Sequence, residues 1–163
     1  MIQDIFEFCC YWIAEVGIQF NLSYYAINII VFCYIEPFVT GFMIGSALFA
    51  LIFRNKITIN INIWLFRIFV ITVIAVFALS IPQALEDLTF YNKPLDFLQS
   101  TRAIKESNPV ILEKFNFAVN ELKEIAKNYN TTYEVVNIVI YVIILPFSCI
   151  VSYFILRYAK TRN

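Results

Sequence analysis

The feature that most constrains this chain is an apolar run from Tyr24 to Phe53, which carries a single formal charge at Glu36. About 20 predominantly apolar residues are enough for a helix to cross the hydrocarbon core of a bilayer. Inside lipid every backbone polar group must be paired within the protein, so a run of this length favours a helix. We therefore expect a transmembrane helix over residues 24–53.

Two further apolar runs follow, at residues 61–83 and 133–157. The whole chain is 61% hydrophobic with a mean hydropathy of +0.74, whereas soluble domains are about 45–50% apolar. The sequence thus predicts an all-α integral membrane protein with three transmembrane helices. We expect residues 1–163 to form a single membrane-embedded unit.

The N-terminal segment, residues 1–22, has polar side chains spaced three or four apart. Asp4, Glu7, Tyr11 and Glu15 form a narrow polar stripe on a helix that is otherwise widely apolar. This pattern predicts an interfacial amphipathic helix lying in the plane of the membrane surface. A helix buried against other protein is the alternative.

Residues 84–131 differ in kind, because they carry acidic and basic side chains in nearly equal number. We expect an extramembrane segment with a solvated charged surface. Asn108-Pro109 is a helix-start signal, and apolar residues then recur at helical spacing to about Tyr129. A shorter helix over roughly residues 94–106 is expected to precede it, giving a helical pair between spans two and three.

Short basic segments predict how the chain is oriented. Arg54 and Lys56 follow the first span. Arg157 precedes the basic tail, residues 158–163, which contains Lys160 and Arg162. Three spans place these segments on one face, as the positive-inside rule requires. We expect the N-terminus outside and the C-terminus in the cytoplasm or matrix, in a bacterial or mitochondrial inner membrane.

Glu36 is the principal candidate site residue. An intramembrane carboxylate is costly and usually pairs with another group or marks an ion or proton path. A protonated or paired carboxylate that only fixes helix packing is the alternative. Pro37 removes a backbone donor and frees the carbonyl of Cys33, and Pro146 does the same to Val142, so helix kinks are predicted at both prolines.

A second candidate is the packing motif Gly41-x-x-x-Gly45, which is followed by Ser46. Small residues at this spacing allow another helix to approach closely. At about 100° per residue the two glycines lie far around the helix from Glu36. The first span therefore has two faces that require protein contacts, which favours helices from other membrane subunits as partners.

Aromatic and basic side chains near the span ends are expected to anchor the chain at the membrane surface. Tyr24 and Tyr25 precede the first span, and Trp64 lies near the start of the second. Arg67, only about 5 Å deeper along the helix axis, is expected to extend towards the polar surface. Bound lipid is the only cofactor-like molecule that we expect.

Several function classes are excluded by composition. The chain has no histidine and only three glycines, which removes His-ligated haem and zinc sites and nucleotide-binding loops. Its net charge is zero, so no nucleic-acid partner is indicated. The vicinal Cys9-Cys10 pair has lipidation or redox chemistry as one interpretation and plain burial as the preferred one. We expect neither catalysis nor a metal site.

Three functional hypotheses follow. The first is a non-catalytic accessory subunit of a larger membrane complex, either bioenergetic, such as the respiratory chain, or a transport assembly. The second is an ion- or proton-translocating component that uses Glu36. The third and weaker one is a small immunity-type membrane protein whose 84–131 segment binds a toxin from outside.

Overall fold

The computed structural model describes residues 1–53 and 56–161, so the basic residues Arg54 and Arg162 lie outside the described residues. Within those ranges all regular structure is helical. The elements are α1 (Ile2–Gln19), α2 (Tyr24–Asn28), η1 (Ile29–Ile35), α3 (Glu36–Phe53), α4 (Lys56–Phe90), α5 (Pro94–Leu98), α6 (Pro109–Asn128), α7 (Tyr133–Asn137), η2 (Ile138–Ile144) and α8 (Leu145–Thr161).

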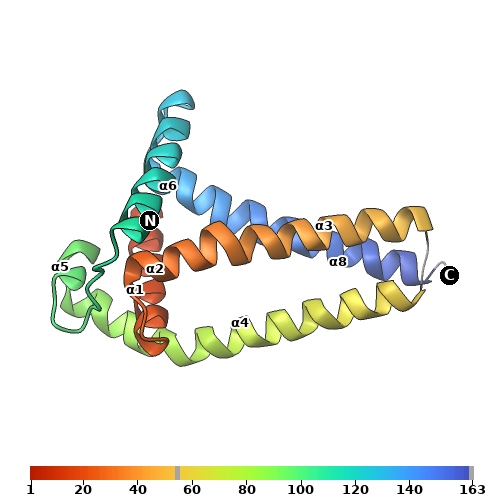
Figure 1. The fold of residues 1–163 in the computed structure, drawn as a ribbon, viewed down its shortest axis with the longest axis horizontal. Coiled ribbons are helices and arrows are strands. Elements are labelled where there is room, and N and C mark those ends of the chain that lie inside the picture. Colours follow the sequence, from red (N-terminus) through yellow and green to blue (C-terminus); the bar gives the residue numbers. More distant parts are fainter. Residues whose placement is uncertain (54–55, 162–163) are drawn as a thin grey trace.

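Three continuous helices are long and apolar enough to cross a membrane: Tyr24–Ile52, Ile59–Phe90 and Tyr133–Thr161. This confirms three long apolar helices in an all-helical fold. They extend side by side from one end of the molecule, where α1, α5 and α6 gather, to the other end, where α3 and α8 finish and α4 begins (Figure 1). Helices α1 and α6 lie across the ends of the long helices (Figure 1).

The segment after the second long helix differs from the sequence-based expectation. Helix α4 does not end near residue 83 but continues to Phe90, because Asp87 is buried and paired with Arg102 rather than solvated. The prediction of a helix over residues 94–106 was wrong beyond its first turn, since α5 ends at Leu98. The chain after α5 instead follows an irregular path that brings Arg102 to its carboxylate partners.

The backbone widens before each proline at which a kink is predicted. A seven-residue π-helical segment precedes each proline: η1 precedes Pro37 and η2 precedes Pro146. The ring of a proline clashes with the carbonyl four residues earlier and offers no N–H to it. A π-type turn relieves that clash, and such turns occur frequently at functional sites.

The chain contains two copies of one structural unit at a constant spacing of 109 residues. The first copy comprises α1 to α3 and the second comprises α6 to α8. In each, a transverse helix leads through a tight turn into a long helix with a π-helical segment before a proline. Matching residues are Asn21 and Asn130, Ser23 and Thr132, Tyr24 and Tyr133, Asn28 and Asn137, Phe32 and Tyr141, and Pro37 and Pro146.

The tight turns of the two copies also match in detail. Asn21 and Asn130 both adopt positive φ, at 56° and 50°, a conformation that asparagine tolerates better than most residues. Leu22 N–H donates to Gly17 O at 2.8 Å, and in the second copy the matching bond from Thr131 is 2.9 Å long. Both transverse helices therefore end in a Schellman motif with asparagine in the left-handed position.

Equivalent residues of the two copies meet each other along the centre of the bundle. The rings of Phe32 and Tyr141 lie 4.8 Å apart between centroids, and Thr40 Oγ1 lies 3.4 Å from Cys149 Sγ. Contact between equivalent positions is what a two-fold axis produces, here running along the long helices. One buried cluster near this axis contains the equivalent pairs Ala47 and Leu156, and Ala50 and Ala159.

Candidate functional site

Glu36 is the first residue of α3 and lies in the middle of the first long helix. Its side chain is half-buried, and its Oε2 atom is buried without a hydrogen-bond partner in the described part of the chain. The equivalent residue in the second copy is Leu145, which begins α8 at the same point after the same wide turn. The fold therefore does not require a carboxylate here.

The residues about one helical turn before and after Glu36 contact the second copy across the two-fold axis. Four residues before it Phe32 contacts Tyr141, and four residues after it the Thr40 hydroxyl contacts the Cys149 thiol. Among the residues described, no ion pair includes Glu36. Chemically this carboxyl group can hold a proton or pair with a donor or cation supplied from outside the chain.

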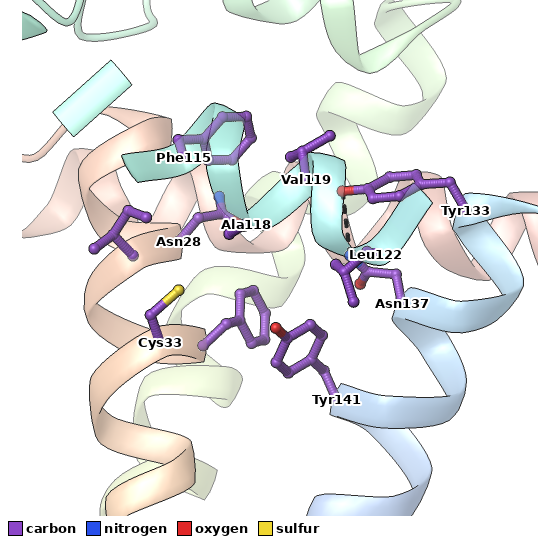
Figure 2. Close-up of a pocket in the computed structure, with 11 residues that line it drawn as sticks. Asn28, Cys33, Phe115, Ala118, Val119, Leu122, Tyr133, Asn137 and Tyr141 are labelled. Carbon is purple, nitrogen blue, oxygen red and sulfur yellow. Dashed lines mark hydrogen bonds between the residues drawn. The ribbon is translucent and has the colours of Figure 1, made fainter. Parts of the chain in front are cut away.

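A small cavity lies between η1, η2 and α6 (Figure 2). Its volume of about 30 Å³ suits a water molecule rather than an organic substrate. Equivalent polar residues face it from both copies: Asn28 donates to Tyr24 O at 2.7 Å, and Asn137 donates to the Tyr133 hydroxyl at 3.3 Å. The dashed line in Figure 2 marks the latter bond.

A wider, mainly apolar groove of about 510 Å³ adjoins this cavity on the outer side of η1, beneath the start of α6. At its edge, Lys114 Nζ donates to the Tyr34 hydroxyl at 3.2 Å. Glu113 also lines the groove, so the charges at its rim balance. The groove has the character of an apolar recess and not of a binding site for a charged solute.

The glycines of the predicted packing motif do not pack within the described chain. Gly41 and Gly45 are exposed, and a Cβ atom added to either would meet nothing within 4 Å. Ser46 is half-buried. Helix α3 instead packs on α8 through a neighbouring face that includes Met43 and Ala47. The face of α3 best suited to close helix contact is therefore open.

The expected surface anchors have different environments. Trp64 is 61% exposed, and the Arg67 guanidinium lies 5.4 Å from the centre of its ring, a cation–π contact. Tyr24 instead packs between the two transverse helices, α1 and α6, which together form the transverse layer. Its hydroxyl donates to Cys10 Sγ at 3.5 Å, and its ring meets Phe115 edge-on. Tyr25 packs on the same phenylalanine ring.

The vicinal cysteines are free thiols. Cys10 is buried, and this burial raises the pKa of its thiol to about 12. A thiol held protonated in this way is a poor nucleophile. The geometry therefore favours a packing role for Cys10 over redox or lipid attachment chemistry.

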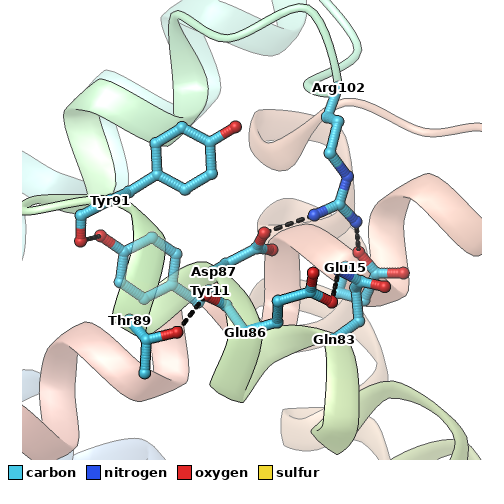
Figure 3. Close-up of polar contacts among 8 residues, drawn as sticks. All are labelled: Tyr11, Glu15, Gln83, Glu86, Asp87, Thr89, Tyr91 and Arg102. Carbon is cyan, nitrogen blue, oxygen red and sulfur yellow. Dashed lines mark hydrogen bonds and ion pairs between the residues drawn. The ribbon is translucent and has the colours of Figure 1, made fainter.

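A buried ion-pair cluster joins the transverse layer to the second long helix (Figure 3). Arg102 Nη2 lies 2.6 Å from Glu15 Oε2, and its Nη1 pairs with Asp87 Oδ1. Glu15 is 7% exposed and Asp87 2% exposed. Nearby, the Tyr11 hydroxyl donates to the Tyr91 carbonyl at 3.2 Å. The cluster binds α1, the end of α4 and the loop after α5 together.

Local sequence patterns do not indicate this cluster. Glu15 continues the polar stripe of the first helix, and Asp87 and Arg102 lie in a segment of mixed charge that resembles a solvated surface. The three residues come together only through the tertiary fold. Their geometry favours a structural role, since one guanidinium pairs with carboxylates from two helices.

In the described ranges no group of three or more His, Cys, Asp or Glu residues is placed to hold a metal ion. No protein-family model, curated protein or solved structure matches this chain.

Proposed function

We propose that this chain is an integral membrane protein that serves as a non-catalytic subunit of a larger membrane complex, bioenergetic or transport. The observation that supports this most directly is the buried, unpartnered Oε2 atom of Glu36 on an apolar helix. A carboxyl group at membrane depth pairs with protein or lines a functional path. Because the chain supplies no such partner among its described residues, another subunit is the natural source.

The proposed orientation follows from the arrangement of the helix ends. The end of α8, which carries Arg157 and Lys160, lies with the end of α3 and the start of α4 (Figure 1). The positive-inside rule assigns this end to the cytoplasm or matrix. Helices α1 and α6 and the N-terminus then lie on the outer side of a bacterial or mitochondrial inner membrane, in contact with lipid headgroups.

The test is purification from native membranes in a mild detergent. We expect stable co-purification with other membrane proteins, and a wild-type chain that elutes as a clean monomer would refute the proposal. The informative variant is Glu36→Leu, because Leu145 occupies the same position in the second copy. We expect this variant to keep its helical content while losing the partner. Leu145→Ile is the matched control and should retain it.

A second candidate function is ion or proton conduction. It is favoured by the contact between Thr40 and Cys149, which places further polar groups along the axis one helical turn after Glu36. The test is proton or cation flux in vesicles reconstituted with the chain alone. Conduction through Glu36 predicts that Glu36→Gln abolishes flux while Glu36→Asp retains part of it. Equal flux from the wild type and Glu36→Gln would remove this candidate.

A further inference from the structure

The apolar groove beneath the start of α6 has a polar rim of defined chemistry. Its volume of about 510 Å³ lies within the range of roughly 300–1,000 Å³ that is typical of ligand pockets. Two of the described residues that line it, Glu113 and Lys114, are charged. Neither takes part in an ion pair within the described residues. The groove therefore presents one cation and one anion beside an apolar surface.

Lys114 is positioned by Tyr34, a residue of η1 that lines the same groove. The lysine Nζ donates to the Tyr34 hydroxyl at 3.2 Å and lies 5.9 Å from the centre of the tyrosine ring. A lysine ammonium group has three N–H donors, and a tyrosine hydroxyl can donate as well as accept. Two N–H groups and one O–H group at this point can therefore bind an acceptor from outside the chain, and phosphate oxygens are strong acceptors of such bonds.

The two-copy architecture shows that the fold does not require this polar pair. At the spacing of 109 residues, Ile143 is equivalent to Tyr34 and Ile5 is equivalent to Lys114. All four residues are exposed. Equivalent positions of the same structural unit are thus apolar in one half of the molecule and carry a cation and a hydroxyl in the other. Because isoleucine serves the fold equally well at both positions, folding alone does not account for the pair.

An exposed aromatic stripe continues from the groove along the first long helix. Phe38 and Phe42 follow Tyr34 at intervals of four residues, and they are 73% and 40% exposed. Their rings stack with centroids 6.4 Å apart. Residues at this spacing lie on one side of a helix, and eight residues extend about 12 Å along its axis. An extended apolar chain in the groove can therefore continue in contact with this stripe.

We propose that this groove is a binding site for a phospholipid whose headgroup carries a phosphate and a primary ammonium group, as phosphatidylethanolamine does. The phosphate accepts hydrogen bonds from Lys114 and Tyr34, and the ammonium group donates to Glu113. One acyl chain lies in the groove and along the aromatic stripe. This inference rests on the proposed function only in its membrane placement, which puts α6 among the lipid headgroups, and it does not depend on a partner subunit.

Charge complementarity selects this headgroup among the phospholipids. An anionic lipid without an ammonium group brings its negative charge close to Glu113 as well as to Lys114, and the first of these contacts is repulsive. A choline headgroup has the same net charge as ethanolamine but has no N–H donor for the glutamate. An apolar helix of a partner protein fills the groove but provides no acceptor for the lysine.

The experiment is native mass spectrometry of the full chain in a mild detergent. The chain is titrated with phospholipids that share the same acyl chains and differ in the headgroup, which is ethanolamine, choline or glycerol. We expect the apparent dissociation constant of the ethanolamine lipid to be about tenfold lower than that of the other two, because only this lipid forms charge-assisted hydrogen bonds at both rim residues.

Variants of the rim residues then test the geometry. Tyr34→Ile with Lys114→Ile copies the equivalent residues of the other half, and we expect it to bind the ethanolamine lipid about tenfold more weakly with unchanged helical content by circular dichroism. Lys114→Gln alone, at an exposed position, gives the same test without a change in the long helix. Glu113→Gln should make the ethanolamine and choline lipids bind equally. The matched control is Lys123→Ile, which removes one charge from an exposed position of α6 outside the groove and should bind like the wild type.

Three results would overturn the inference: tighter binding of the glycerol lipid, equal binding of all three lipids, or an unchanged preference in the Lys114 variants. A photo-crosslinking amino acid at Phe117, which lines the groove and is 66% exposed, extends the test to native membranes. We expect a lipid adduct there, and a protein adduct would also overturn the inference. If the chain co-purifies with a partner but shows no headgroup preference, the inference fails and the proposed function stands. If the chain purifies alone and its preference for the ethanolamine lipid requires Lys114, the inference stands and the subunit role fails.

Discussion

The Arg102 cluster allows a quantitative prediction, because one guanidinium pairs with two buried carboxylates. Replacing Arg102 by methionine keeps much of the side-chain volume and removes both charge-assisted hydrogen bonds, each of which contributes about 1.5–3 kcal/mol. The arginine side chain is 36% exposed, so water screens part of this and the lower end applies. We expect Arg102→Met to cost about 3 kcal/mol, in line with breaking other buried pairs.

For a chain of this size that cost corresponds to a fall of about 6–12 °C in the unfolding midpoint. The assay is thermal unfolding in detergent, followed by circular dichroism at neutral pH. Lys105→Met, at an exposed position in the same loop, is the control and should change the midpoint by less than about 2 °C. A triple variant that also carries Glu15→Gln and Asp87→Asn should recover most of the loss, because no buried charge then remains unpaired. If Arg102→Met unfolds no earlier than Lys105→Met, the cluster does not stabilise the fold.

Two further predictions concern the start of the first long helix. A Cβ added to Gly17 would lie 2.9 Å from the Leu22 carbonyl oxygen, a backbone atom that cannot easily move, so Gly17→Ala should lower stability by about 1 kcal/mol in the same thermal assay. Gly41→Ala is the control, because the space around Gly41 is open, and it should be neutral or raise stability by up to about 1 kcal/mol. Equal effects at the two glycines would contradict the close contact at Gly17. Hydrogen bonds from the Ser23 hydroxyl and a backbone N–H hold the pKa of Glu106 below its usual range. The contribution of Glu106 to stability is therefore complete above the ordinary glutamate pKa of about 4.3. It is lost as the pH falls through the lower pKa that Glu106 has in the folded protein. The stability difference between the wild type and Glu106→Gln should vanish in acid, and a difference that grows there would contradict the assignment.

The long helices could be predicted from the sequence because their signal is length and apolarity alone. The start of α6 was equally clear, since Asn108 caps the helix by accepting from Val110 N–H at 3.0 Å and proline follows it. The end of α4 could not be predicted, because the sequence does not show whether Asp87 is buried or solvated. Only Arg102, 15 residues later, decides which of the two it is.

The two-copy architecture is present in the sequence, but no single span shows it. Its signal is an aligned pattern, Asn-x-Ser/Thr-Tyr followed by a second asparagine and then Pro-Phe, at residues 21–38 and 130–147. Comparison of the chain with itself detects such a pattern. Such a comparison does not predict that equivalent residues meet across a two-fold axis, because sequence spacing does not show which faces of α3 and α8 are in contact.

The wide turns of η1 and η2 lie at the same level and touch through Phe32 and Tyr141. A helix interrupted by a proline bends most readily at such a point. Because the two rings are in contact, we expect a tilt of the part of one long helix that precedes its proline to displace the ring on the other. Since these parts lead from α1 and from α6, the contact predicts that a displacement of α1 shifts α6 as well.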